Sequence, residues 1–174
     1  MRVTMEREDK KSIALTGFMG VGKTSIGQAL AKKTGRQLID IDAEIEKAHE
    51  LPVPEIFRKY GEEYFREKEK EMIQSYSQEK KKVLSLGGGA FLQPEVREIC
   101  MASCYVIHLE LSWDKWVDRC EQLIETRPVL QGKSLDEMKT LFHARKKIYQ
   151  EYHLKINTDY LSIDEAADEI IQLL

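Results

Sequence analysis

A glycine-rich run near the start of the chain ends in a lysine and a threonine. The run fits the pattern G-x-x-x-x-G-K-[ST] and reads Gly17-Phe18-Met19-Gly20-Val21-Gly22-Lys23-Thr24. Glycines let a backbone curl so that successive N–H groups point into one anion-sized hollow. A helix that follows adds the positive end of its dipole, while the lysine supplies charge for the β- and γ-phosphates and the threonine hydroxyl can bind Mg²⁺. The run therefore predicts a site for nucleotide phosphates.

The context of the run supports this interpretation. An apolar segment, 13–15, precedes it and a helical pattern follows it, so a chance glycine-rich turn is the weaker alternative. GTPases share the loop but usually carry N-K-x-D and D-x-x-G motifs, and the sequence contains neither. We therefore expect ATP and a transfer reaction. The predicted nucleotide-binding residues of the loop are Gly17, Met19, Gly20, Val21, Gly22, Lys23, Thr24 and Ser25.

Two carboxylates, Asp40 and Asp42, come at the end of the next apolar run. Ligands of open α/β sheets gather at the carboxyl ends of the strands. Alternation along an extended segment would place both carboxylates on one side. One could orient Mg²⁺-bound water, and the other could hold an acceptor hydroxyl and take its proton. The alternative for Asp42 is the N-cap of the following helix, and it could fill both roles.

Three consecutive glycines, Gly87, Gly88 and Gly89, follow the next apolar run. Their cost in backbone entropy suggests that the backbone approaches a ligand closely, with a plain flexible turn as the alternative.

Short apolar runs alternate with longer helical patterns along the chain, and this order must position the residues above. The strands are expected at 13–15, 37–41, 83–86, 104–109 and 154–156, and the helices at 23–33, 45–49, 55–60, 62–80, from 94, from 113, from 135 and at 163–173. Such alternation predicts an α/β three-layer sandwich with a parallel, five-stranded sheet. We expect one domain over 1–174, with 1–11 frayed.

Composition narrows the partners. The 174 residues carry a net charge of −3, which gives no general electrostatic case for nucleic acid. No apolar run has the length of a membrane span, and the charged N-terminal residues lack the apolar core of a secretory signal. Cys100, Cys104 and Cys120 have no disulfide-framework spacing, so we interpret them as buried small hydrophobes in a reducing cytosol. We expect a cytoplasmic monomer with no nucleic-acid or membrane partner.

Taken together, these motifs resemble the shikimate kinase family over nearly the whole chain from 13 onward. The matching pieces are GFMGVGKTSIG, LIDIDAEIE, PEIFRKYGEEYFREKE, SLGGGA, TRPVL and ARKKIY. The resemblance implies a P-loop kinase fold with a short lid (119–133) and a substrate-binding helical segment (42–76). It also implies ATP-dependent phosphorylation of the 3-hydroxyl of shikimate, with Mg²⁺ as cofactor.

Roles carried over from the family fall on matching positions. Asp42 looks like the acceptor-hydroxyl ligand and candidate base, and Asp40 like the residue that supports Mg²⁺ with Thr24. Gly87, Gly88 and Gly89 resemble the loop that approaches the ring of the acceptor. Arg66 and Arg145 resemble the pair of arginines that binds the substrate carboxylate. Arg127 resembles the lid arginine that acts with Lys23 in catalysis. Arg119 resembles a second arginine near the nucleotide.

Physical reasoning alone leaves the two carboxylate-binding arginines open. Planar forked donors suit a carboxylate. However, Arg66 lies on a charged helical face and Arg145 precedes two lysines, so both could be ordinary surface charges. The family also commonly has a proline in the region of Lys146 and Lys147. Another small-metabolite kinase and a catalytically silent nucleotide-binding module remain the competing functions.

Overall fold

The structure is a computed structural model, and it describes residues 11–119 and 132–174. Within these residues the strands form one five-stranded sheet in the order β2-β3-β1-β4-β5, and every pair of neighbours is parallel. The strands are β1 (Ser12–Thr16), β2 (Gln37–Asp40), β3 (Lys82–Ser85), β4 (Cys104–Glu110) and β5 (Leu154–Asn157). The predicted parallel, five-stranded sheet is confirmed.

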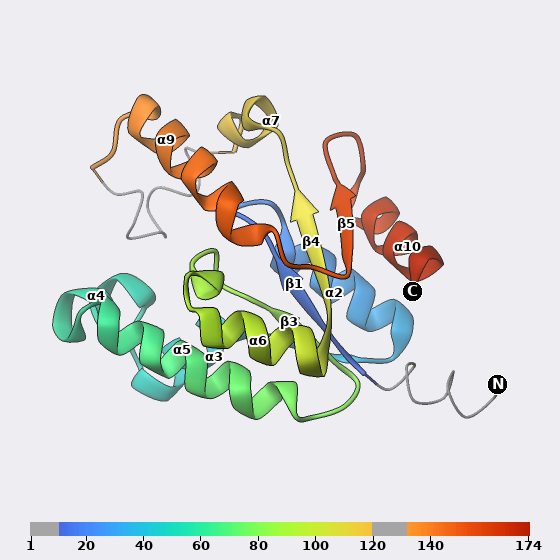
Figure 1. Ribbon diagram of the computed structural model, residues 1–174, viewed down its shortest axis with the longest axis horizontal. Coiled ribbons are helices and arrows are strands. Elements are labelled where there is room, and N and C mark those ends of the chain that lie inside the picture. Colours follow the sequence, from blue (N-terminus) through green and yellow to red (C-terminus); the bar gives the residue numbers. More distant parts are fainter. Residues whose placement is uncertain (1–10, 120–131) are drawn as a thin grey trace.

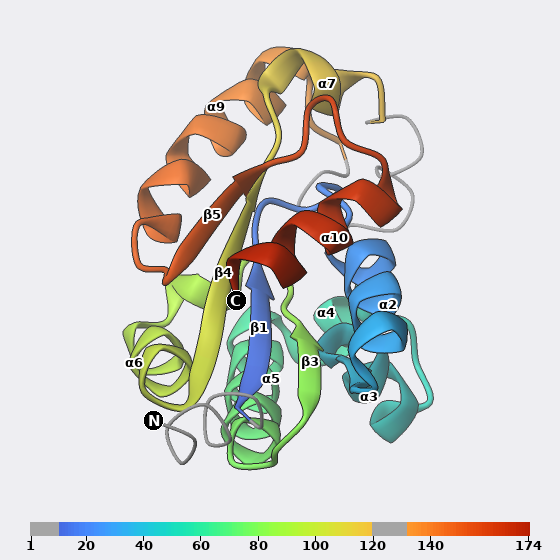
Figure 2. The ribbon, with the colours of Figure 1, turned by 90° about the vertical axis from the view of Figure 1, so that its right-hand side faces the viewer.

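Helices cover both faces of the sheet (Figures 1 and 2). One layer consists of α2 (Lys23–Thr34) and α10 (Ile163–Leu173), and the other of α5 (Glu62–Ser77) and α6 (Pro94–Ser103). Every residue of β1 is buried because this central strand is covered from both sides, which explains its apolar run. The three-layer sandwich is therefore confirmed.

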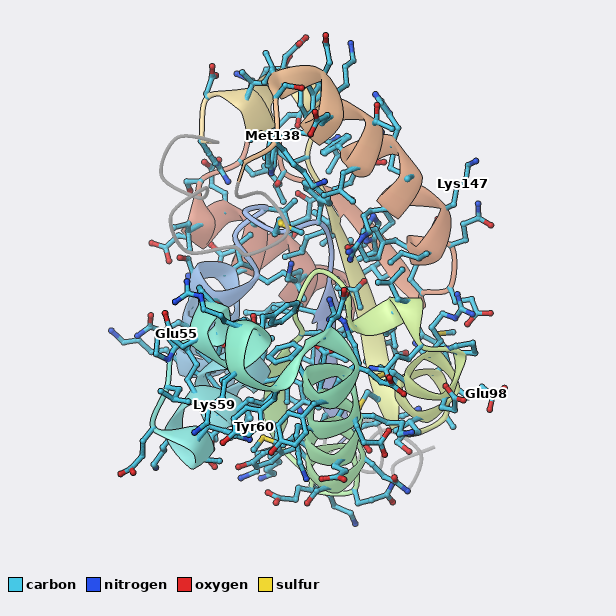
Figure 3. All side chains as sticks on the ribbon, turned by 90° about the vertical axis from the view of Figure 1, so that its left-hand side faces the viewer. Glu55, Lys59, Tyr60, Glu98, Met138 and Lys147 are labelled. Carbon is cyan, nitrogen blue, oxygen red and sulfur yellow. The ribbon has the colours of Figure 1, made fainter. Side chains whose placement is uncertain are left out.

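The remaining elements lie around the carboxyl ends and the β2 edge of the sheet (Figure 1). They are α3 (Ile41–His49), α4 (Val53–Tyr60), η1 (Ala90–Leu92), α7 (Trp113–Val117), α9 (Leu135–Lys146) and η3 (Lys147–Tyr149). Figure 3 views the molecule from the side of α4 and α5, with Lys59 and Tyr60 marking the end of α4. The segment predicted to bind substrate, 42–76, corresponds to α3, α4 and α5. Most of the predicted lid lies outside the described residues.

The boundary between β2 and α3 differs from the prediction. The strand ends at Asp40 and the helix begins at Ile41, because the Asp40 carboxylate accepts the Ala43 N–H at 3.1 Å and so acts as the N-cap. The alternative role for Asp42, as N-cap, is thus wrong. So is the expected extended alternation between the two aspartates, since Asp42 lies in the first turn of α3.

The end of α5 also differs, because the helix stops at Ser77 and not near Lys80. Ser12 on β1 donates from its hydroxyl to the Glu79 carbonyl at 2.8 Å, and this bond directs the chain away from the helix axis toward β3.

Two of the cysteines are buried thiols, as expected. Cys100 and Cys104 are both fully buried, and burial raises the pKa of Cys104 to about 11, which disfavours a reactive thiolate. Cys120 lies outside the described residues.

Candidate functional site

The phosphate loop connects β1 to α2, with Gly22 as the last residue before the helix. Gly22 has φ +98° and ψ 21°, a left-handed conformation that disfavours other residues, and its carbonyl accepts the Ile26 N–H at 2.8 Å. The N-terminus of α2 opens onto a cavity of about 360 Å³, which we call the phosphate cavity. Six of the eight predicted loop residues line it: Gly20, Val21, Gly22, Lys23, Thr24 and Ser25.

The Lys23 side chain folds back onto the phosphate loop and binds its carbonyl groups. Its ammonium donates to the carbonyl oxygens of Gly17 at 2.6 Å and Phe18 at 3.0 Å, and only 8% of the residue is exposed. The positive charge is thereby held at the mouth of an anion-binding loop, where phosphate oxygens can replace or join the carbonyl groups.

Three oxygen-bearing side chains meet beside the loop. The Thr24 hydroxyl donates to Asp40 Oδ2 at 2.7 Å and lies 3.1 Å from Ser85 Oγ. Asp40 and Ser85 are partners in the β2–β3 register, so adjacent strand ends bring them together. Carboxylate and hydroxyl oxygens form a donor set that suits a hard cation such as Mg²⁺.

Asp42 lies between the phosphate cavity and a smaller one of about 40 Å³, and it lines both. We call the smaller one the acceptor cavity. Although Asp42 is helical, it faces the same region as Asp40, so the predicted convergence holds for a different geometric reason. The acceptor cavity is lined by Met19, Asp42, Val53, Phe57, Phe65, Arg66, Glu69, Gly87, Gly88 and Gly89. Met19 was predicted to bind nucleotide, but in the structure it lines the acceptor cavity and not the phosphate cavity.

Arg66 lies on α5 and forms ion pairs along its own helix. Nη1 is 2.9 Å from Glu69 Oε1, and Nη2 is 3.4 Å from Glu62 Oε1. The expected pairing on a helical face is therefore present, but only 15% of the Arg66 side chain is exposed. The guanidinium thus lines the acceptor cavity while its helix neighbours balance its charge.

Glu69 is a site residue that the sequence reasoning missed. It is fully buried, and burial, with a further contribution from the Asp42 charge, raises the pKa of its carboxyl to about 7 despite the opposing effect of Arg66. Gln93 Nε2 lies 3.4 Å from Glu69 Oε1 and donates to the Arg66 carbonyl at 3.0 Å. The spacing of three residues between Arg66 and Glu69 predicts an ion pair between them, but it does not indicate the burial that makes Glu69 part of the site.

The three glycines leave no room for side chains. A Cβ on Gly87 would lie 2.9 Å from both Asp42 Oδ1 and Glu69 Oε2, and one on Gly89 would lie 2.7 Å from Arg66 Cζ. A Cβ on Gly88 would lie 3.0 Å from the Met19 nitrogen. In the structure the three glycines approach other parts of the protein, namely α3, α5 and the phosphate loop. Their close approach to a ligand stays a prediction.

Arg145 comes from the opposite end of the chain, at the end of α9. It is 7% exposed and donates from Nη1 to the Gly88 carbonyl at 3.1 Å, whereas Lys147 is exposed and points outward in Figure 3. Arg145 forms no ion pair with the described residues, and burial, with repulsion from Arg66, lowers its pKa. A buried guanidinium of this kind favours an anionic ligand.

Of the two remaining predicted arginines, Arg119 and Arg127, the structure describes only Arg119. Arg119 follows α7, lines the phosphate cavity and donates to the Gly20 carbonyl at 3.3 Å. Arg127 lies outside the described residues, so its assignment stays a prediction.

A wall of the phosphate cavity was also missed from the sequence. It follows β5 and consists of Thr158, Leu161, Ser162 and Ile163. The rule that ligands gather at the carboxyl ends of strands would have found this segment if it had been applied to the last strand.

The phosphate loop follows the first strand of a parallel sheet. Asp42 separates its cavity from a second cavity, which is lined by Arg66. This arrangement places the molecule among the P-loop kinases that act on small acceptors. The family model described as shikimate kinase matches residues 19–174. The chain therefore belongs to the shikimate kinase family.

Individual relatives agree with this family. The chain is 54% identical to shikimate kinase of Oceanobacillus iheyensis, with 95% of this chain and 90% of the relative covered. It is 51% identical to shikimate kinase of Bacillus subtilis, with 95% and 89% covered. The solved structure of shikimate kinase from Acinetobacter baumannii in complex with shikimate superposes with a TM-score of 0.90, covers 98% and 96% of the two chains and is 32% identical. A gluconokinase from Sinorhizobium meliloti, with a TM-score of 0.55 and 16% identity over 94% and 93% of the chains, shares the fold alone.

Proposed function

We propose that the two cavities of this protein carry out the reaction of its family. That reaction transfers the γ-phosphoryl group of ATP to the 3-hydroxyl of shikimate and yields shikimate 3-phosphate and ADP, a step toward chorismate and the aromatic amino acids. The observation that carries the proposal is the position of Asp42, which lines both cavities. An acceptor hydroxyl held by this carboxylate would face the phosphates of the nucleotide.

ATP would occupy the phosphate cavity. The loop N–H groups and the Lys23 ammonium would bind the β- and γ-phosphates, and Arg119 would add charge beside Gly20. Leu161 and Ile163 offer an apolar wall for the base. Phosphoryl transfer needs positioning and charge neutralisation more than covalent chemistry from the protein, and these groups supply both.

Mg²⁺ would be held by Thr24 and Asp40, with Ser85 beside them. One carboxylate and neighbouring hydroxyls leave coordination positions for water and phosphate oxygens, the arrangement that Mg²⁺ prefers in kinases. The ion supplies charge neutralisation for the phosphates when it is bound.

Shikimate would occupy the acceptor cavity. Arg66 and Arg145 would bind its carboxylate, and the glycines Gly87, Gly88 and Gly89 would let its ring lie against the backbone. Asp42 would accept the hydrogen bond of the 3-hydroxyl and orient it toward the γ-phosphate. Arg127, in the predicted lid, is proposed to reach the phosphates during catalysis, where an arginine can contribute roughly 10³–10⁵ in rate.

A coupled assay of ADP release tests the function. We expect ADP release that depends on shikimate in wild type and a fall of roughly 10²–10⁴-fold in Asp42→Asn. Turnover with gluconate or a nucleoside monophosphate in place of shikimate would favour a different metabolite kinase. Nucleotide binding without turnover on any acceptor would favour a silent module. A pH–rate profile of both variants decides whether Asp42 also takes the proton.

We further infer a cytoplasmic monomer that binds neither nucleic acid nor membranes. The net charge of −3 supports the absence of a nucleic-acid partner. Among the described helices, none combines the length and apolar character needed to cross a bilayer. Light scattering of the purified protein tests the oligomeric state.

A further inference from the structure

The Tyr149 hydroxyl shares an acceptor with Arg145. Tyr149 lies on η3, one helical turn after Arg145, and is 4% exposed. Its hydroxyl donates to the Gly88 carbonyl, and Arg145 Nη1 donates to the same oxygen at 3.1 Å. A carbonyl oxygen has two lone pairs, so it can accept both bonds at once. Gly88 itself lines both cavities, so this shared oxygen lies at the junction of the two predicted binding regions.

The ring of Tyr149 is held independently of its hydroxyl. It stacks on the ring of His108, with centroids 5.1 Å apart and planes at 24°. His108 is 7% exposed on β4, and its Nδ1 lies 3.4 Å from Thr16 Oγ1, at the end of β1. The rigid sheet therefore fixes the ring, and the ring in turn fixes the direction in which the hydroxyl donates.

The chemical state of both aromatic residues suits this arrangement. Burial lowers the pKa of His108 to about 4, so its ring is neutral near pH 7. Burial also raises the pKa of Tyr149, so its hydroxyl keeps its proton and remains a donor. The pair thus gives a constant, uncharged support over the physiological pH range.

An arginine without such support would lose much of its directionality. Its side chain has many rotamers, and binding a carboxylate with two parallel bonds requires one fixed plane. Among the described residues, Arg145 is anchored by its bond to the Gly88 carbonyl and by a direct interaction with the Tyr149 side chain. Whatever fixes the Gly88 carbonyl and the Tyr149 hydroxyl therefore fixes the guanidinium.

We propose that Tyr149 is a positioning residue for the acceptor: it holds the Gly88 carbonyl so that Arg145 keeps its remaining N–H groups available for the substrate carboxylate. This inference rests on the proposed carboxylate-binding role of Arg145. Tyr149 does not touch the reacting atoms, so its loss should weaken acceptor binding and leave the phosphoryl-transfer step largely intact.

Steady-state kinetics of Tyr149→Phe test the inference. The substitution keeps the ring on His108 and removes only the hydroxyl. We expect the KM for shikimate to rise roughly tenfold, the loss of about one buried hydrogen bond. The KM for ATP and kcat should stay within about twofold to threefold of wild type. Tyr152→Phe is the matched control, because Tyr152 also stacks on His108, at 5.9 Å, but makes no hydrogen bond with the described residues.

A double-mutant cycle with Arg145→Lys distinguishes positioning from general stability. If Tyr149 acts through Arg145, the effect of Tyr149→Phe on the KM for shikimate should shrink to less than about threefold in the Arg145→Lys background. An equal effect in both backgrounds, or an unchanged KM in the single variant, would overturn the inference. So would an equal rise in the KM for ATP.

An unstable variant and an inactive wild-type enzyme each have a distinct interpretation. If Tyr149→Phe is too unstable for kinetics, the shift of its melting temperature by shikimate with ADP, compared with that of Tyr152→Phe, gives the same answer. A wild-type shift in the variant would then overturn the inference. Failure of the wild-type enzyme to turn over shikimate would instead refute the proposed function on which the inference rests.

Discussion

The side chains of Arg66 and Glu69 form an ion pair in which Nη1 and Oε1 are 2.9 Å apart and the carboxylate is fully buried. The second oxygen of Glu69, Oε2, makes no hydrogen bond with the described residues. Because burial raises the pKa of Glu69 to about 7, the arginine that is proposed to bind the substrate is balanced by a carboxyl that titrates near neutrality. This relationship couples the acceptor cavity to pH.

Glu69→Gln should change how stability depends on pH. The folded-state pKa of about 7 lies above the ordinary value of 4.5, so the folded protein binds more protons between these values. The contribution of Glu69 is therefore present below pH 4.5 and is lost as pH rises to about 7, a change of up to about 3 kcal/mol. Urea unfolding from pH 4.5 to 7.5 should therefore show the stability of wild type falling relative to that of Glu69→Gln as pH rises, whatever other groups titrate in this range. Equal slopes in both proteins would contradict the prediction.

His108→Asn should have the opposite effect. Burial lowers the folded-state pKa of His108 from 6.5 to about 4, so its contribution is present above pH 6.5 and is lost as pH falls toward 4. In wild type this slope opposes that of Glu69 between pH 4.5 and 6.5. The same urea series should therefore show His108→Asn losing less stability on acidification than wild type. A steeper acid loss in the variant would refute the assignment.

Much of the architecture follows from local pattern. The strand after Gly35 and the helix from Lys23 were predictable because apolar runs, a left-handed glycine and the phosphate-loop motif all agree. The boundary at Asp40 was not, because a strand residue and an N-cap residue look alike until the Ala43 N–H is placed. The strand assignment of Asp40 was thus correct, the extended conformation expected for Asp42 was wrong, and the proposed roles of both aspartates stay predictions.

The missed site residues depend on long-range packing. Glu69 reads as one more charge on a solvated helix, and only its burial beside Asp42 and Gly87 makes it unusual. The role of Tyr149 depends on its hydrogen bond to the Gly88 carbonyl, and these two residues are 61 positions apart in the sequence. Desolvation and such non-local contacts are tertiary properties, which no local pattern encodes.

Thr24→Val should weaken the use of Mg²⁺. The substitution keeps the shape of the side chain and removes the hydroxyl that bonds to Asp40 and lies beside Ser85. We expect the Mg²⁺ concentration for half-maximal activity to rise at least about tenfold, the loss of one ligand or charged hydrogen bond. Thr24→Ser retains the hydroxyl and should behave like wild type in a Mg²⁺ titration. Equal Mg²⁺ dependence in Thr24→Val would exclude Thr24 from the metal site.

Arg145→Lys should raise the KM for shikimate by about 10- to 100-fold, because an ammonium cannot form two parallel bonds to a carboxylate. The KM for ATP should change little. Lys147→Met is the matched control, since this neighbouring cation is exposed and points away from the site (Figure 3). If both substitutions raise the KM for shikimate equally, the effect comes from general charge and not from a binding contact.

Gly89→Ala and Gly35→Ala should separate crowding from backbone strain. Gly89 has φ −102°, which alanine adopts readily, but its Cβ would lie 2.7 Å from Arg66 Cζ, so the arginine must move. Gly35 has φ +67° with nothing within 4 Å of a Cβ, so alanine there strains only the backbone, by about 1 kcal/mol. We expect Gly89→Ala to raise the KM for shikimate at least about fivefold, since a displaced Arg66 loses a charged hydrogen bond. Gly35→Ala should lower the melting temperature with an unchanged KM. Loss of stability without a change in the KM in Gly89→Ala would show that Arg66 does not bind the acceptor.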